Sequence, residues 1–158
     1  MDHPATIRPD TEGTRVAVVG DLYRYLATGD ETGGAYAMID ATVPPGGGPP
    51  PHVHSREEES FFVLEGEITF RLDDQTIVAG PNTFLNMPIG SLHSFKNESG
   101  LPARMLITLA PAGLEKMFLE AGKVLTSPDE QPQPPTEQEI KKLLEVAPKY
   151  GVQIHVPH

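Results

Sequence analysis

The chain is 158 residues long, which is enough for one domain with a hydrophobic core of its own. Its 12 Lys and Arg residues and 22 Asp and Glu residues give a formal charge of −10 at pH 7, and an acidic surface repels nucleic acid and anionic lipid, so we expect neither as a partner. Because the chain has no cysteine, disulfides and metal-thiolate sites are excluded, and any metal must be bound through nitrogen and oxygen ligands.

The beginning of the chain does not resemble a targeting segment. Residues 1–14 lack the basic flank and the apolar core of a secretion signal. No apolar stretch approaches the roughly 20 residues that a membrane-spanning helix needs. The expected location is therefore the cytoplasm.

Short segments of β type recur along residues 15–110. They are rich in Val, Ile, Thr, Phe and Tyr, and the breaks between them carry Gly, Pro, Asn and Asp. This regular spacing predicts an all-β sandwich or barrel. The expected strands are 15–20, 22–27, 35–43, 60–66, 67–72, 76–80, 83–87, 93–97 and 103–110.

Two helices are predicted after the last of these strands. The first covers residues 114–121, where apolar residues recur at helical spacing and Gly122 follows as a C-terminal cap. The second begins at the capping-box pair Thr136 and Glu139 and ends at Pro148. Both helices have one apolar face, which indicates that each packs against the β structure.

The expected organisation is one domain in two parts. Residues 1–111 form a β-barrel that includes the N-terminal strands, and residues 112–158 form a helical extension with a proline-rich linker. Residues 112–122 can be interpreted as a helix packed on the barrel or as a lid over its mouth.

The segment PPPHVHSREEESFFVLEG, residues 49–66, places His52 and His54 one residue apart. Residues two apart on a strand project to the same face, so both imidazoles can face one atom. Glu59 can join them only if a turn interrupts the chain at 55–58, because its odd offset from His54 otherwise puts it on the opposite face. Glu59 is either solvated at the start of its strand or paired with an opposing charge, because burying a carboxylate alone is costly, and a divalent metal would supply that charge.

A third histidine follows a turn later in the chain. Pro88 and Gly90 predict a tight turn that leads into a strand carrying His93. Considered singly, the histidine pair fits a surface loop, and His93 fits a core or edge position. Three histidines and one carboxylate on separate strands of a small β domain together favour a shared metal site.

The spacing of these residues resembles the first motif of the cupin superfamily, G-x5-H-x-H-x(3,4)-E-x6-G. Glu58 satisfies the shorter histidine-to-glutamate spacing, but only Glu59 leaves six residues before Gly66. The residues that match the motif without a gap are Gly46, His52, His54, Glu59 and Gly66.

The second cupin motif, G-x5-P-x-G-x2-H-x3-N, is present with one departure. Asn82 stands where the motif begins with glycine, and Asn is the next best residue for a left-handed turn. The matching residues are Pro88, Gly90, His93 and Asn97. One copy of each motif is present, so the chain resembles a single-domain cupin.

This resemblance implies an all-β fold, an antiparallel double-stranded β-helix or jelly-roll barrel, here with two C-terminal helices. It also implies that His52, His54, Glu59 and His93 bind one divalent metal. Imidazole and carboxylate ligands suit Mn, Fe, Co, Ni or Zn better than Ca or Mg. Because bound imidazoles must be neutral, metal affinity is expected to fall below about pH 6. Homodimers with paired edge strands are common among similar proteins, so a homodimer is expected.

The expected partner is a small molecule, apolar or aromatic in character. Basic residues are few near the motifs, which makes recognition of phosphate or several carboxylates less favourable. Sequence alone leaves open whether the nearby apolar residues line a cavity or fill the core: Phe61, Val63, Ile68, Phe70, Phe84, Met87 and Phe95.

Residues 111–122 and 134–158 resemble the tail of bacterial single-domain cupins grouped with flavonol (quercetin) 2,3-dioxygenases. In those enzymes the equivalent of Glu59 binds metal and accepts the flavonol hydroxyl proton, which implies that Glu59 is both ligand and general base. We therefore expect a metal-dependent dioxygenase acting on a flavonol-like or other enolic aromatic substrate. The alternatives are a metal-holding module that binds or senses small molecules without turnover, and another cupin enzyme such as an isomerase, epimerase or decarboxylase.

Overall fold

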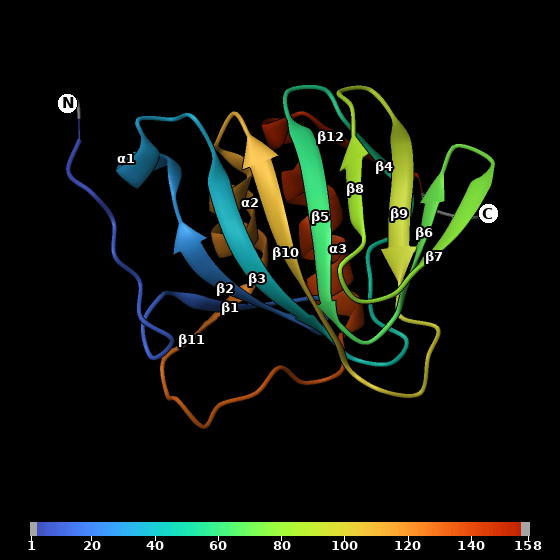
Figure 1. Ribbon diagram of the computed structural model, residues 1–158, viewed down its shortest axis with the longest axis horizontal. Helices are drawn as coiled ribbons and strands as arrows, with labels where there is room; N and C mark the ends of the chain where they lie inside the picture. Colours follow the sequence, from blue (N-terminus) through green and yellow to red (C-terminus); the bar gives the residue numbers. More distant parts are fainter. Residues whose placement is uncertain (1–2, 156–158) are drawn as a thin grey trace.

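Two antiparallel sheets form the framework of the computed structural model, which describes residues 3–155 (Figure 1). The smaller sheet has five strands, in the spatial order β12 (Val152–Ile154), β4 (His52–His54), β9 (Leu92–Lys96), β6 (Ile68–Leu72) and β7 (Gln75–Ala79). The larger sheet has seven, in the order β11 (Lys123–Leu125), β1 (Arg15–Val18), β2 (Asp21–Ala27), β3 (Ala37–Val43), β10 (Ala103–Ala110), β5 (Glu58–Glu65) and β8 (Phe84–Met87).

The two sheets pack through their inner faces. Side chains alternate along β5, so that Phe61 and Val63 are buried while their neighbours are half-buried. Phe61 contacts Phe70 of the smaller sheet, with ring centroids 5.0 Å apart. Within residues 3–155 no strand of one sheet is hydrogen-bonded to a strand of the other. The predicted β fold is confirmed, whereas the predicted closed barrel is not: the sheets form two facing layers with separate edges.

Both predicted helices are present. Helix α2 (Leu114–Ala121) is followed by Gly122, whose backbone is extended, and a β-carbon there would lie 2.5 Å from the carbonyl oxygen of Ala17. Glycine is therefore needed at this position for close approach to β1 and not for a left-handed cap. Helix α3 (Glu137–Val146) begins with the predicted capping box and continues into a 3₁₀ turn at Ala147–Tyr150.

The segment after residue 111 also contains strands that the sequence pattern missed. Strand β11 pairs with β1, and β12 pairs with β4. Each is only three residues long, which is too short for an alternating pattern to be recognised. A short helix, α1 (Gly29–Thr32), was also not predicted. Residues 112–158 thus contribute to both sheets as well as supplying helices.

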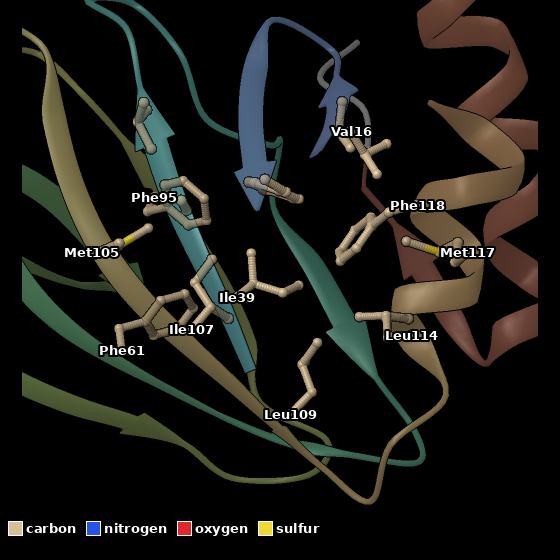
Figure 2. Close-up of a cluster of buried hydrophobic side chains, with 14 of the residues drawn as sticks. Val16, Ile39, Phe61, Phe95, Met105, Ile107, Leu109, Leu114, Met117 and Phe118 are labelled. Atoms are coloured by element: carbon tan, nitrogen blue, oxygen red, sulfur yellow. The ribbon is translucent and has the colours of Figure 1, made fainter. Parts of the chain in front are cut away.

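Helix α2 packs on the inner face of the larger sheet. Figure 2 shows Leu114 and Phe118 opposite Ile39 and Leu109, which come from β3 and β10. Phe118 also contacts Tyr23 of β2 edge to face, with ring centroids 4.9 Å apart. The helix lies behind β3 and β10 in the view of Figure 1, and its buried side chains belong to the same hydrophobic core as theirs. No helix within residues 3–155 is both long and apolar enough to span a membrane.

Asn97 holds the segments beside the smaller sheet together. It is fully buried, and its amide nitrogen donates to the carbonyl oxygens of Val43 at 3.0 Å and Leu101 at 2.7 Å. Its amide oxygen accepts from the backbone nitrogen and the hydroxyl of Ser99. The asparagine of the second motif is therefore structural and does not belong to the histidine cluster.

We expect Asn97→Ala to lower the free energy of unfolding by about 2–4 kcal/mol, because it leaves several buried groups without partners. Chemical denaturation of the purified variant measures this. Asn86→Ala is the control, since the Asn86 side chain is exposed and, among residues 3–155, is hydrogen-bonded only to the exposed Glu58. Equal stability of the two variants would contradict the structural role of Asn97.

Candidate metal centre

Four residues predicted from the motifs come together between the sheets. His52 and His54 lie on β4, and His93 lies directly opposite His52 on the neighbouring β9. Glu59 lies on β5 of the other sheet, because the chain bends between the end of β4 and the start of β5. All four side chains are buried. The adjacent Glu58 is exposed, so the structure places Glu59 in the cluster, as the motif spacing predicts.

The donor atoms of the four residues are close enough to share one ion. One nitrogen or oxygen atom from each lies within 4.8 Å of the others. Oε1 of Glu59 is 3.1 Å from Nε2 of His54 and 2.9 Å from Nε2 of His93. Ligands about 2.1 Å from a metal and about 90° apart are themselves about 3 Å apart. The spacing of the donors therefore fits one divalent metal.

The other nitrogen of each imidazole faces an acceptor. Nδ1 of His52 lies 2.9 Å from the carbonyl oxygen of Pro50, and Nδ1 of His93 lies 3.2 Å from that of Ser91. A carbonyl oxygen can only accept, so with a metal bound Nδ1 would carry the proton and Nε2 would be the ligand atom. Outer acceptors of this kind fix the ring orientation of histidine ligands.

The outer contact of His54 is different. Its Nδ1 lies 3.3 Å from Oε1 of Glu57, but the two atoms are poorly aligned for a hydrogen bond, and neither has another partner among the described residues. Both side chains are buried. Glu57 therefore stabilises a protonated His54 through this close contact. No sequence pattern pointed to this residue, because it lies outside the motif positions.

Charges within the cluster determine how it holds protons. Burial acts to lower the pKa of His54, but contacts with Glu57 and Glu59 outweigh it and raise that pKa to about 9. Burial acts to raise the pKa of Glu59, but hydrogen bonds from His54 and His93 lower it well below its usual value. Burial lowers the pKa of His52 to about 4. A metal must therefore displace a proton from His54, and this competition begins at a higher pH than the value near 6 expected from free imidazole.

A small cavity of about 70 Å³ adjoins the cluster. Its polar walls include His52, His54 and Glu59, and Leu114, Met117 and Phe118 of α2 close it from the helical side. Among the apolar residues considered from sequence, only Phe95 lines this cavity. Phe84 is 63% exposed on the edge strand β8, and the others belong to the core.

A larger groove of about 1000 Å³ lies outside the cluster. Its walls come from the proline-rich stretch before β4, the linker at 131–135 and α3, and none of the four cluster residues lines it. The groove and the cavity share wall residues, including Val19, Pro50 and Leu143. The wall between them is therefore one residue thick in places.

Helix α2 is tethered at both ends. At its start, the Glu115 carboxylate accepts hydrogen bonds of 2.6 Å from the backbone nitrogens of Gly29 and Gly113. The Tyr25 hydroxyl donates to the Glu115 carbonyl oxygen at 2.5 Å. At its end, the chain continues directly into β11, which pairs with β1. These contacts favour the interpretation of α2 as a fixed wall of the cavity.

Two further polar residues line the cavity, and the sequence patterns did not identify them. Asp21 and Tyr23 are buried on the inward face of β2. Burial raises the pKa of Asp21 to about 8, and the smaller effect of the Tyr23 hydroxyl opposes it. Burial, together with the charges of Asp21 and Glu59, raises the pKa of Tyr23 well above its ordinary value. The cavity therefore contains a carboxyl group that favours its neutral form.

Comparison with known proteins points to one family. Residues 39–109 match the model of the Cupin domain. Quercetin 2,3-dioxygenase from Bacillus subtilis is 31% identical over 111 residues, which are 70% of this chain and 33% of that protein. Quercetin 2,3-dioxygenase from Aspergillus japonicus is 27% identical over 146 residues, which are 85% of this chain and 41% of that protein. This chain thus spans about a third to two-fifths of the length of these curated relatives.

Solved structures support the same fold. The polyketide cyclase RemF from Streptomyces resistomycificus superposes with a TM-score of 0.60 at 23% identity, covering 79% of this chain and 89% of that one. A predicted oxalate decarboxylase from Thermotoga maritima gives a TM-score of 0.62 at 18% identity, covering 67% of this chain and 99% of that one. At these identities the superpositions establish the likeness of fold alone.

We expect His54→Ala to remove bound metal, because it deletes a ligand and leaves Glu59 with one fewer compensating group. Glu59→Gln should weaken binding without abolishing it. Metal content after dialysis, measured by elemental analysis, checks both. His155→Ala is the control, since His155 is exposed and lies outside the cluster. Full metal content in both cluster variants would show that the site is assigned wrongly.

The Asp21 carboxyl should also make stability depend on pH. Because its pKa is raised from 3.8 to about 8 on folding, the folded state binds more protons than the unfolded state between these values. This group therefore removes stability as pH rises through that window, by at most about 1.4 kcal/mol per pH unit. Denaturation of metal-free wild type and Asp21→Asn between pH 4 and pH 9 measures it. We expect the variant to gain stability relative to wild type as pH rises, and a constant difference would refute the shift.

Proposed function

Residues 39–109 of this chain are a cupin domain, and from that membership we propose a metal-dependent dioxygenase of the quercetin 2,3-dioxygenase type. The proposed substrate is a flavonol-like or other enolic aromatic molecule. The observation that carries the proposal is the convergence of three imidazoles and one carboxylate, three of which, His52, His54 and Glu59, also line a mainly apolar cavity. The similarity to two proteins named quercetin 2,3-dioxygenase supports the choice of reaction.

We assign His52, His54, Glu59 and His93 as the ligands of one divalent transition metal, Mn, Fe, Co, Ni or Zn. Their nitrogen and oxygen donors suit this group of metals. When bound, the metal supplies Lewis acidity toward an oxygen of the substrate, and a redox-active metal also supplies reactivity toward dioxygen.

Glu59 is the proposed general base as well as a ligand. A carboxylate with a lowered pKa holds a proton weakly, so it accepts one only from a comparatively acidic hydroxyl. An enolic hydroxyl is more acidic than an alcohol, because the resulting charge is delocalised. The electrostatics of the cluster thus favour an enolic substrate over a simple alcohol or sugar.

The size of the cavity limits how such a substrate binds. Pockets for drug-sized ligands usually measure about 300–1,000 Å³, whereas the cavity beside the cluster measures about 70 Å³. Only the reacting end of a flavonol fits next to the cluster, and the groove of about 1000 Å³ beyond the shared wall is large enough for the rest. We propose that binding involves a displacement of this wall.

The small cavity also favours a second candidate, another metal-dependent cupin enzyme with a smaller substrate. An isomerase, epimerase or decarboxylase would use the same ligands. A cupin module that binds a small molecule without turnover is the remaining alternative. Fold alone does not distinguish these functions.

The organisation of the chain follows from the same interpretation. We propose that residues 1–111 and 112–158 form one jelly-roll domain, which the pairing of β11 with β1 and of β12 with β4 supports. We also propose a cytoplasmic homodimer that pairs through an edge strand. Strand β8 is an edge of the larger sheet and presents the exposed Phe84.

The test of this function is dioxygen uptake by protein loaded separately with Mn, Fe, Co and Ni, with quercetin as substrate. We expect metal-dependent uptake that falls by at least about 100-fold in Glu59→Gln, because a general base contributes 10²–10⁴-fold. Glu58→Gln is the control, since Glu58 is the exposed neighbour. No uptake with metal demonstrably bound would exclude the flavonol assignment and favour the smaller substrate.

A further inference from the structure

Asp21 is a buried carboxyl group that the proposed chemistry does not use. It is the first residue of β2, it is 2% exposed, and it lines the cavity that also contains His52 and Glu59. Its Oδ1 atom has no hydrogen-bond partner among the described residues. Buried polar atoms nearly always have a partner, and one without a partner costs folding free energy. A ligand that enters the cavity is a source of the missing partner.

The backbone around Asp21 is strained in order to place it there. Strands β1 and β2 are joined through Val19 and Gly20, which both have positive φ angles, +46° and +91°. Glycine adopts this conformation easily, but for a β-branched residue such as valine it is unfavourable. Val19 lines both the cavity and the outer groove. The strained turn therefore lies in the wall between them, with Asp21 on the cavity side.

A second segment is shaped around the same carboxyl group. A β-carbon at Gly47 would lie 2.6 Å from Oδ1 of Asp21, which is closer than real contacts allow. Gly47 belongs to the glycine run before β4, the strand that carries two of the proposed metal ligands. The turn at Val19 and Gly20 and the segment at Gly47 are distant in sequence, yet both leave room for the Asp21 side chain. Oδ1 of that side chain makes no hydrogen bond to the described residues.

We propose that Asp21 is a substrate-binding residue, which donates a hydrogen bond from a neutral carboxyl group to a carbonyl oxygen of a substrate held at the metal centre. This inference rests on the proposed function and specifies its substrate class: an enolone, with a carbonyl oxygen beside the enolic hydroxyl. A neutral carboxyl group has one O–H donor. The nearby cavity walls from Val18, Leu114 and Phe118 are apolar, so they disfavour the charged form.

The test measures binding of two probes to the full chain loaded with Zn²⁺, which has no redox chemistry of its own. The probes are quercetin and maltol, two enolones of different size, and titration calorimetry without dioxygen gives their Kd values. Asp21→Asn keeps a donor of similar shape, whereas Asp21→Val removes it. Asp40→Asn is the matched control: Asp40 is also buried, but it lies on β3 facing away from the cavity, where it pairs with Arg104.

We expect Asp21→Asn to bind a probe within about threefold of wild type and Asp21→Val to bind it at least about tenfold more weakly, the loss of roughly one buried hydrogen bond. Zn²⁺ content should be unchanged in all variants, as should probe binding by Asp40→Asn. Asp21→Val should not be less stable than wild type at pH 8, since it removes an unpaired buried acid; a purely structural Asp21 would instead lower stability.

The outcomes separate this inference from the dioxygenase proposal. If maltol binding depends on Asp21 but quercetin neither binds nor is oxidised, the flavonol assignment is wrong and the role of Asp21 stands. If Asp21→Val binds the probes as tightly as wild type, the proposed role of Asp21 is wrong, whatever the measurement of dioxygen uptake shows. Equal weakening in Asp21→Asn and Asp21→Val overturns the neutral donor, and failure of wild type to bind either probe overturns the inference as a whole.

Discussion

The negative charge of Glu59 is the constraint on which the rest of the site depends. This carboxylate begins the inward face of β5, between Leu109 and Met87 on the neighbouring strands, where it is only 5% exposed. The groups that compensate it come from β4 and β9 of the other sheet. Within residues 3–155 no strand of one sheet is hydrogen-bonded to a strand of the other, so the contacts of Glu59 with His54 and His93 form a direct polar link between the two layers. The four-residue cluster and the packing of the two layers are therefore one arrangement.

The cluster was predictable because its residues obey fixed spacings. Two histidines on one strand share a face by the period of the strand alone, and the motif spacing selected Glu59 over Glu58. Asn82 adopts the left-handed conformation that its place in the second motif requires. Asp21 and Glu57 were not predictable in the same way. An acidic residue after a Val-Gly turn or within a run of glutamates is usually exposed, and only the three-dimensional packing buries these two.

The same distinction explains the predictions that were wrong or incomplete. Periodicity predicted α2 and α3, because each repeats its apolar residues over several turns. It could not predict β11 or β12, whose existence depends on partners far away in sequence. It also could not tell that β8 is an edge strand, so Phe84 had the same pattern as core residues such as Phe61. Closure of a barrel is a property of strand order, which a local pattern does not contain.

The pairing of β12 with β4 has a consequence for how the protein is made. Ile154 lies opposite His52, and Val152 lies opposite His54. One edge of β4 therefore finds its hydrogen-bonding partner only in residues near the end of the described chain. Its other neighbour, β9, is also distant in sequence. Such non-local pairings are slow to form, because a long stretch of chain must be ordered first. During synthesis on the ribosome, the two histidines therefore remain unsupported until β12 has emerged, so that incorporation of the proposed metal would belong among the last events of maturation.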